Sequence, residues 1–260
     1  METLLKSGRY IFAVAILAFG VVQIIFARHA APVPQVIPWL PEIPWLAYLT
    51  GAVFLGTGVC IASNLRARLA AMLLGMLFLV CVLVLQIARL ADNFASGGAR
   101  TVAFETVSFC AAAFTLAGNL SDEGRSLGEW KSLANALMRS GPYLFAISLV
   151  VFGIDHFRAI QLVGGLVPAW IPGSGKFWAY FTGVAFVASG LSIATKLLAR
   201  WGAFLIGVMF LIYFLALHLP RILTYPRSHN PAELSSAFIA LGMCGASWIC
   251  GASFRGSGAQ

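Results

Sequence analysis

Long apolar stretches without charge recur along the chain, separated by short polar segments. Six of them, each about 18 to 21 residues long, lie at positions 10–27, 45–63, 69–88, 178–195, 201–219 and 234–254. An α-helix of that length crosses the roughly 30 Å hydrocarbon core of a bilayer. Two less uniform stretches, at 101–117 and 141–160, complete a set of eight. Because backbone amides in lipid must be hydrogen-bonded within their own segment, the pattern predicts eight transmembrane helices rather than buried strands.

The composition agrees with this prediction. Apolar residues make up 60% of the 260 residues, charged residues 10%, and the mean hydropathy is +0.89. A soluble domain of this size needs more polar surface, so we predict an all-α integral membrane protein and not a soluble enzyme. Lys6 and Arg9 precede the first stretch, as in a secretory signal. A second copy of that stretch recurs in mid-chain, however, where nothing is cleaved, so we predict a membrane helix.

The formal net charge of +8 does not indicate nucleic-acid binding, because the basic residues stand in ones and twos at helix ends. In a membrane protein their distribution indicates orientation. The N-terminus, the C-terminal tail and the loops on the same side hold ten Lys and Arg residues, and the opposite loops hold seven. We therefore expect a multi-pass protein of a bacterial inner membrane, surrounded by lipid and with both termini cytoplasmic.

Two parts of the chain resemble each other. Residues 51–89 align without a gap on residues 183–221, and 16 of the 39 pairs are identical. Just upstream, the segment 38–41, Pro-Trp-Leu-Pro, corresponds to the segment 169–172, Ala-Trp-Ile-Pro. Hydrophobicity alone would not align Gly, Arg, Pro and Trp in the same order. The sequence therefore predicts an internal duplication.

Each copy contains four predicted helices, an even number, so both enter the membrane in the same direction. We predict a first four-helix membrane repeat at residues 1–118 and a second at 141–260, arranged as two parallel-oriented four-helix bundles. Residues 119–140, between them, form the one strongly polar stretch. Apolar residues recur there at helical spacing, which predicts a short amphipathic helix on the cytoplasmic face. A plain solvated linker is the alternative.

The outer loop between the first two helices of each copy is rich in Pro and Trp. The first loop spans residues 32–45 and the second spans residues 168–178. Proline prevents a continuous helix there, and tryptophan prefers the headgroup level of the bilayer. Either a stiff lid over the outer mouth of the bundle or a simple interfacial anchor would have this composition.

Three segments of the second copy resemble the DoxX-like membrane proteins. They are Val-Pro-x-Trp-Ile-Pro at 167–172, Ala-Tyr-Phe-Thr-Gly at 179–183, and Leu-x-Ala-Arg-x-x-Ala-x-Leu at 197–205. Members of that family are typically single four-helix units, so the resemblance would cover this chain twice. The resemblance also implies a function, because some members are linked to thiosulfate:quinone oxidation or to membrane oxidoreductase complexes. Such roles do not transfer by fold alone.

Ionisable side chains inside a membrane are costly, so each is a candidate functional residue. Most of them gather near the outer helix ends of the second copy. Asp155 and His156 lie near the end of the fifth predicted helix, His218 and Arg221 at the end of the seventh, and Glu233 at the start of the eighth. His218 and Arg221 are three residues apart and are expected on one helix face. We treat these five as the candidate binding residues of the second copy.

The first copy carries a less ionisable version of this group, in which Val22 stands where Asp155 does. We expect the Arg and Glu of each copy to form a partly buried ion pair between its third and fourth helices. The histidines are peculiar to the second copy, so we expect any titratable chemistry there, in a cavity that both line. The other corresponding residues are Gln23 and His156, Gln86 and His218, Arg89 and Arg221, and Glu105 and Glu233.

Three interpretations of the polar group stay open: structural or interfacial side chains, a pocket for a small molecule, lipid or quinone, and a metal site. His156, His218 and Glu233 would be the metal ligands, but they lack a local motif. The five cysteines form no Cys-x-x-Cys pair and are expected to be small apolar filler. No nucleotide-binding loop, nucleophile elbow or haem-binding histidine pair occurs, so we assign no catalytic residue and no metal.

Two function classes follow. The first is a non-catalytic membrane protein that binds a lipid or small molecule or is the partner subunit of a membrane complex. The second is the quinone-facing component of a membrane oxidoreductase, and both the quinone and the oxidoreductase partner rest on the family resemblance. A secondary transporter is a third alternative, although no helix is visibly broken at mid-membrane by paired Gly and Pro.

Overall fold

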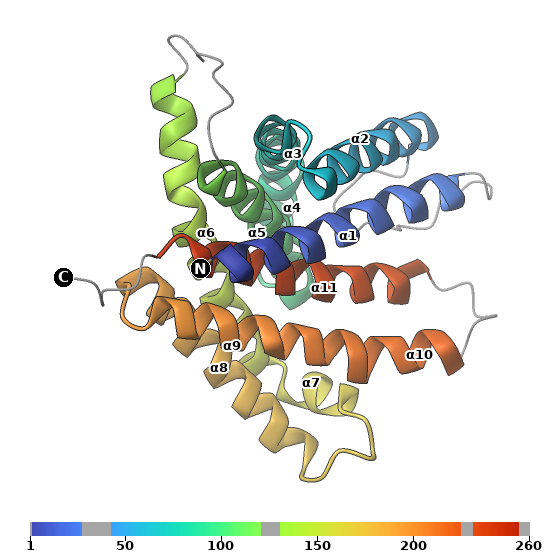
Figure 1. Ribbon diagram of the computed structural model, residues 1–260. Helices are drawn as coiled ribbons and strands as arrows, with labels where there is room; N and C mark the ends of the chain where they lie inside the picture. The colour runs from blue at the N-terminus through green and yellow to red at the C-terminus, as the bar shows by residue number, and fades with distance from the viewer. Residues whose placement is uncertain (1, 28–42, 121–130, 225–230, 255–260) are drawn as a thin grey trace.

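The computed structural model describes residues 2–27, 43–120, 131–224 and 231–254 (Figure 1). Every regular element in these residues is a helix, and eight helical spans are long and apolar enough to cross a membrane. Each span overlaps one of the eight apolar stretches of the sequence, although several begin or end outside it. The predicted fold class, an all-α protein with eight membrane-spanning helices, is confirmed.

Two of the eight spans change their helical geometry along their length. Each consists of an α-helix, a π-helical segment and a short further α-helix. In chain order the elements are α1 (Glu2–Ala27), α2 (Pro44–Ser63), α3 (Ala67–Cys81), the π segment η1 (Val82–Gln86), α4 (Ile87–Asn93), α5 (Gly97–Asn119), α6 (Lys131–Arg158), α7 (Ile160–Leu166), α8 (Gly175–Thr195), α9 (Ala199–Ile212), the π segment η3 (Tyr213–His218), α10 (Leu219–Thr224) and α11 (Pro231–Ala252).

The predicted linker is helical in its last part. α5 ends at Asn119 and α6 begins at Lys131, so residues 131–140 form the first turns of a transmembrane helix. Residues 121–130 of the linker and residues 32–42 of the first outer loop lie outside the described residues. The short helix α7 ends just before the second outer loop. Within that loop, the indole Nε1 of Trp178 donates a hydrogen bond to the carbonyl oxygen of Pro172 at 2.8 Å.

The turns α2–α3 and α8–α9 have the same backbone conformation. Asn64 and Arg66 in the first turn, and Lys196 and Leu198 in the second, have φ angles between 50° and 65°. Residues other than glycine rarely adopt this left-handed conformation, so the surroundings must stabilise it. In the second turn, Ser192 Oγ donates a hydrogen bond to the carbonyl oxygen of Leu197 at 2.6 Å. The similar sequences therefore fold into the same local turn twice.

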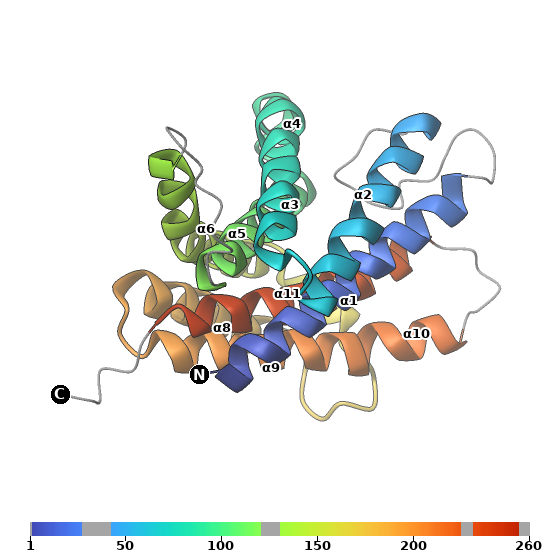
Figure 2. The same ribbon diagram turned by 45° about the horizontal axis from the view of Figure 1, so that its top comes forward.

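α5 and α11 lie in the middle of the molecule and are the most buried of the eight spans (Figures 1 and 2). α1 packs along α2 and α11, and α6 packs along α5 and α8. α3 contacts α2 and α5, and α9 contacts α8 and α11. The spans therefore follow one another in a closed circuit, and α5 and α11 also contact each other within it.

This packing joins the two halves of the chain closely, and their predicted arrangement as two four-helix bundles stays a prediction. The first helix of each half packs on the last helix of the other half, α1 on α11 and α6 on α5. Glycines permit these contacts. A Cβ atom on Gly245 would lie 2.5 Å from the backbone nitrogen of Phe12, and one on Gly141 would lie 2.6 Å from the carbonyl oxygen of Ala111. Helices in lipid associate through such close packing, so the glycines help to decide which helices pair.

Candidate functional site

The nine candidate side chains all belong to the described residues, and they lie toward the helix ends opposite the α2–α3 and α8–α9 turns. We call this the outer end. The structure pairs Asp155 with Arg100, and Glu233 with His218 and Arg221. The polar group of the second half therefore consists of two distinct sets of contacts rather than a single cluster.

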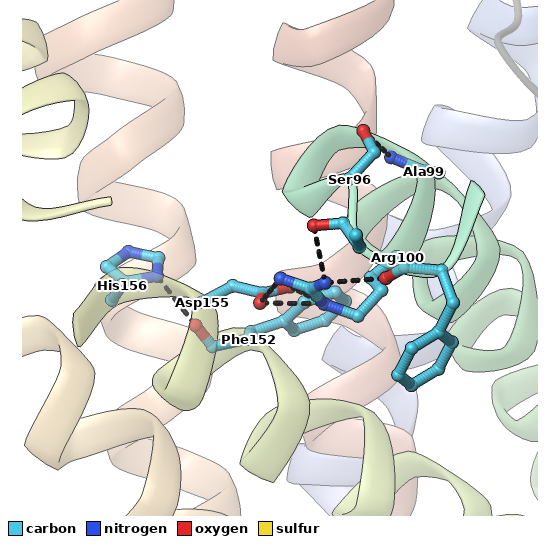
Figure 3. Close-up of polar contacts among 8 residues, drawn as sticks. Ser96, Ala99, Arg100, Phe152, Asp155 and His156 are labelled. Carbon is cyan, nitrogen blue, oxygen red and sulfur yellow. Dashed lines mark hydrogen bonds and ion pairs between the residues drawn. The ribbon is translucent and has the colours of Figure 1, made fainter. Parts of the chain in front are cut away.

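Asp155 forms a buried ion pair with Arg100, which the sequence analysis did not select as a site residue (Figure 3). Arg100 Nε and Nη2 donate hydrogen bonds to Asp155 Oδ1 at 2.9 and 2.5 Å, and both side chains are less than a tenth exposed. Arg100 Nη1 donates to the carbonyl oxygens of Phe94 and Ala95 at 2.7 and 3.1 Å. Several charge-assisted bonds thus offset the desolvation of the two ions and tie α5 to α6.

A local feature holds Arg100 in place. Ser96 caps the N-terminus of α5, and its Oγ accepts a hydrogen bond from the backbone nitrogen of Ala99 at 3.3 Å. The turn before the cap presents the carbonyls of Phe94 and Ala95 to the guanidinium. Serine is a favoured capping residue, so the sequence itself starts the helix at this point.

Glu233 lies in the first turn of α11 and contacts two basic side chains. His218 Nδ1 is 2.8 Å from Glu233 Oε1, and Arg221 Nη1 is 4.0 Å from the same oxygen. Arg221 Nη2 also donates a hydrogen bond to the carbonyl oxygen of Leu166, the last residue of α7, at 3.0 Å. The predicted Arg221–Glu233 pair is thus long, and His218 is the closer partner of the carboxylate. The negative charge suits the N-terminal end of α11 because the helix dipole is positive there.

His156 faces away from the Arg100–Asp155 pair (Figure 3). Its Nδ1 lies 2.8 Å from the carbonyl oxygen of Phe152, and its ring centroid is 4.9 Å from that of Phe186. A carbonyl only accepts hydrogen bonds, so Nδ1 carries the proton, and in the neutral ring Nε2 is an acceptor. The ring is therefore held by its own helix and by an aromatic neighbour on α8.

Both π segments lie at corresponding positions and end at candidate residues. η1 ends at Gln86 and η3 ends at His218. A π-helical turn widens the helix and occurs frequently at functional sites. Gln86 is fully buried, and the side chain of His218 is 14% exposed. The apolar pattern predicts uninterrupted helices here, because no residue in either segment signals a π turn.

In the first half the candidate positions hold mostly neutral side chains. Gln23 and Gln86 are both buried. Among the described residues, the Oε1 atom of Gln23 has no hydrogen-bond donor. Arg89 and Glu105 are half-buried, and each takes part in an interaction. Their predicted pairing with each other stays a prediction.

A cavity of about 490 Å³ lies at the outer end of the second half. It is lined by the end of α6, by α7 and by the start of α8, and not by His156 or His218, which were expected to line a cavity. Among the described residues, no three His, Cys, Asp or Glu side chains gather closely enough to bind a metal ion. The alternative of a metal site built from His156, His218 and Glu233 is therefore not supported.

Residues 145–242 match the model of one protein family, a domain of unknown function (DUF8561). The matched segment begins within α6 and ends within α11, so it includes the five candidate residues of the second half. No curated protein and no solved structure matches the chain. The family description assigns no activity, so a function has to be argued from the geometry.

Proposed function

We propose that this helical membrane protein is a non-catalytic binding protein of DoxX-like type, with a site for a small amphipathic molecule or lipid at the outer end of its second half. The cavity of about 490 Å³ between α6, α7 and α8 carries this proposal. Its volume lies within the roughly 300–1,000 Å³ of typical small-molecule sites. Of the three DoxX-like segments, 167–172 lies between lining residues in the sequence, 179–183 contains Tyr180 of the lining, and 197–205 follows the cavity; together they support the family assignment.

The lining combines charge with aromatic surface. Arg158 and Lys176 supply two cations, and the rings of Phe157 and Tyr180 lie with centroids 6.2 Å apart. Close backbone packing fixes α7 against α8, because a Cβ on Gly164 would lie 2.8 Å from the carbonyl carbon of Gly175. Cations and aromatic faces on one rigid wall suit a molecule with a polar or anionic head and an apolar body.

The test is to identify what co-purifies with the protein in mild detergent. We expect mass spectrometry to find one amphipathic compound, and we expect the Arg158→Gln/Lys176→Gln double variant to lose most of it. Arg200→Gln, at the opposite end of the molecule, is the matched control and should retain the compound. Equal retention by the double variant and the control would refute the site.

A quinone-facing role is the second candidate, and the His218–Glu233 pair favours it. With the Nδ1 proton donated to the carboxylate, Nε2 of neutral His218 is an acceptor for a hydroxyl such as that of a quinol. The electrons would have to pass to a partner protein, namely a membrane oxidoreductase. Quinone extracted with the wild type but not with His218→Phe would support this role, and equal amounts in both would count against it.

The proposed orientation places both termini and residues 119–140 in the cytoplasm of a bacterial cell. The Lys and Arg count supports this orientation. Reporter fusions at Arg125 and Gln260 test it: cytoplasmic-type activity is expected at both positions, and periplasmic-type activity at either would reverse the assignment.

A further inference from the structure

A larger cavity, of about 850 Å³, lies at the end of the molecule opposite the outer site. Five spans meet there: the start of α3, the ends of α5, α8 and α11, and the first half of α6. Both halves of the chain contribute to it. It shares no residue with the cavity of the proposed function, so the two sites are independent.

Three cations from three helical spans line this cavity: Arg68, Arg139 and Lys196. None of the described Asp or Glu residues is among its lining residues. Helix ends also contribute, with roughly −0.5 charge at each of the ends of α5, α8 and α11 and about +0.5 at the start of α3. Arg68 takes part in another interaction, but the two full positive charges of Arg139 and Lys196 already exceed these partial charges, so the cavity favours an anion.

Hydrogen bonds between helices hold one wall of the cavity in place. Asn119 Nδ2 donates to the carbonyl oxygen of Ile249 at 3.0 Å, and Ser253 Oγ donates to Asn119 Oδ1 at 3.1 Å. These bonds join the end of α5 to the end of α11. The half-buried amide of Asn135 supplies a further donor group to the lining. A wall fixed before binding lowers the entropy lost when a polar ligand is bound.

The other edge of the cavity is apolar. Met138 and Pro142 are buried, and Tyr143 is 40% exposed on the adjoining surface of α6. A free anion would gain nothing from this edge, whereas a lipid has both a charged head and acyl chains. Basic pockets between transmembrane helices on the cytoplasmic side bind the head groups of anionic lipids. From this combination we propose that the cavity binds the phosphate head group of an anionic phospholipid, with its acyl chains along α6.

Lipid affinity of the full-length protein tests the proposal. Native mass spectrometry would measure binding of phosphatidylglycerol and of zwitterionic phosphatidylcholine to the wild type and to Arg139→Gln/Lys196→Gln. Each cation near a membrane surface contributes roughly a fivefold gain in affinity for anionic lipid, so the double variant should bind phosphatidylglycerol about 30-fold more weakly. Binding of phosphatidylcholine should change little.

Matched variants separate the site from general charge attraction. Lys6→Gln removes an exposed cation from the same end of the molecule but outside the cavity, and it should bind phosphatidylglycerol like the wild type. Arg139→Lys/Lys196→Arg keeps both charges and should restore most of the affinity. Unfolding temperatures in phosphatidylcholine nanodiscs should agree among all variants, which shows that they fold.

Three outcomes would overturn the proposal. Equal affinity of the double variant and Lys6→Gln for phosphatidylglycerol would show that the cavity is not the site. If inorganic phosphate alone stabilised the wild type as much as phosphatidylglycerol does, a free anion would be identified as the ligand. Tighter lipid binding by Asp122→Asn/Glu123→Gln/Glu129→Gln would show that carboxylates of the chain's own 121–130 segment occupy the cavity instead.

Discussion

In the first half of the chain, four phenylalanine rings from four different helices fill the space between α1, α2, α3 and α5. The rings of Phe19, Phe54, Phe78 and Phe109 form a closed set with neighbouring centroids 5.5 to 6.4 Å apart. All four side chains are fully buried. Nothing in this set titrates, and it requires no ion or hydrogen-bond partner.

In the second half, three of these positions again hold phenylalanine. Phe186 lies 5.9 Å from Phe152 and 5.5 Å from Phe210. The fourth position, in the register that aligns Glu105 with Glu233, is Ala237. Around the remaining rings the second half adds polar aromatic residues: His156 lies 4.9 Å from Phe186, and Tyr213 lies 6.3 Å from Phe210.

The second half adds ionisable side chains to a backbone that both halves share. The corresponding turns and π segments have the same backbone in both halves, so the backbone does not distinguish them. Each ionisable side chain added to the second half instead needs a partner, because an unpaired buried charge is costly. Arg100 pairs with Asp155, Glu233 with His218, and a backbone carbonyl holds His156.

The largest effect is expected from dividing the chain between residues 125 and 126. Alone, the first half leaves α1 without α11, and the second half leaves α6 without α5. We therefore expect neither fragment to accumulate in the membrane by itself, and the two expressed together to co-purify as a complex. Membrane fractionation and affinity pull-down measure this. A fragment that accumulates alone as a monomer would show that a half closes its own bundle.

The next effect is expected from Asp155→Val, which copies Val22 of the first half. This change leaves the buried Arg100 without its counter-ion and should lower the free energy of unfolding by about 3–5 kcal/mol. Adding Arg100→Met replaces the whole pair with apolar groups and should recover most of the loss. Unfolding curves in detergent measure all three proteins. A double variant as unstable as Asp155→Val would mean that the carboxyl has another role.

A smaller loss is expected from Glu233→Gln. It weakens the contact with His218 and removes the charge opposite Arg221, and the carboxylate is one-quarter exposed, so roughly 1–2 kcal/mol should be lost. Arg221→Gln should cost less than about 1 kcal/mol, because its pair is 4.0 Å long and the side chain is one-third exposed. Unfolding curves in the same detergent measure the two losses of stability and show which is larger. A larger loss of stability for Arg221→Gln than for Glu233→Gln would contradict the finding that His218 is the closer partner of the carboxylate.

The smallest effect on stability is expected from His156→Gln and His218→Gln, which copy Gln23 and Gln86. Glutamine retains a donor for Phe152 and Glu233, so the free energy of unfolding should change by less than about 1 kcal/mol. Any ligand bound through the histidine rings should nevertheless be lost, as co-purification would show. Losses as large as that of Asp155→Val would identify the histidines as structural.

Much of the candidate site was visible in the sequence, but its pairing was not. The duplication singled out Asp155 because the first half has valine there, and the same comparison contains a signal for its partner. In the register that aligns Glu105 with Glu233, Arg100 corresponds to Ser228 and so has no basic counterpart in the second half. Asp155 likewise has no acidic counterpart in the first half, and these two residues pair with each other. The two residues are 55 positions apart and share no motif, and only folding brings them together.

The lipid surroundings, the number of spans and the approximate position of each span follow from the sequence alone. The length of each apolar stretch is set by the thickness of the bilayer, and the serine cap of α5 is local chemistry. The tertiary structure alone decided that α1 packs on α11 and α6 on α5, that η1 and η3 are π-helical, and that His218 bonds to Glu233. The physical reason is that lipid is as apolar as the helix surfaces. Hydrophobicity therefore brings every span into the membrane but does not choose its neighbours, which depend on close contacts between residues distant in the chain.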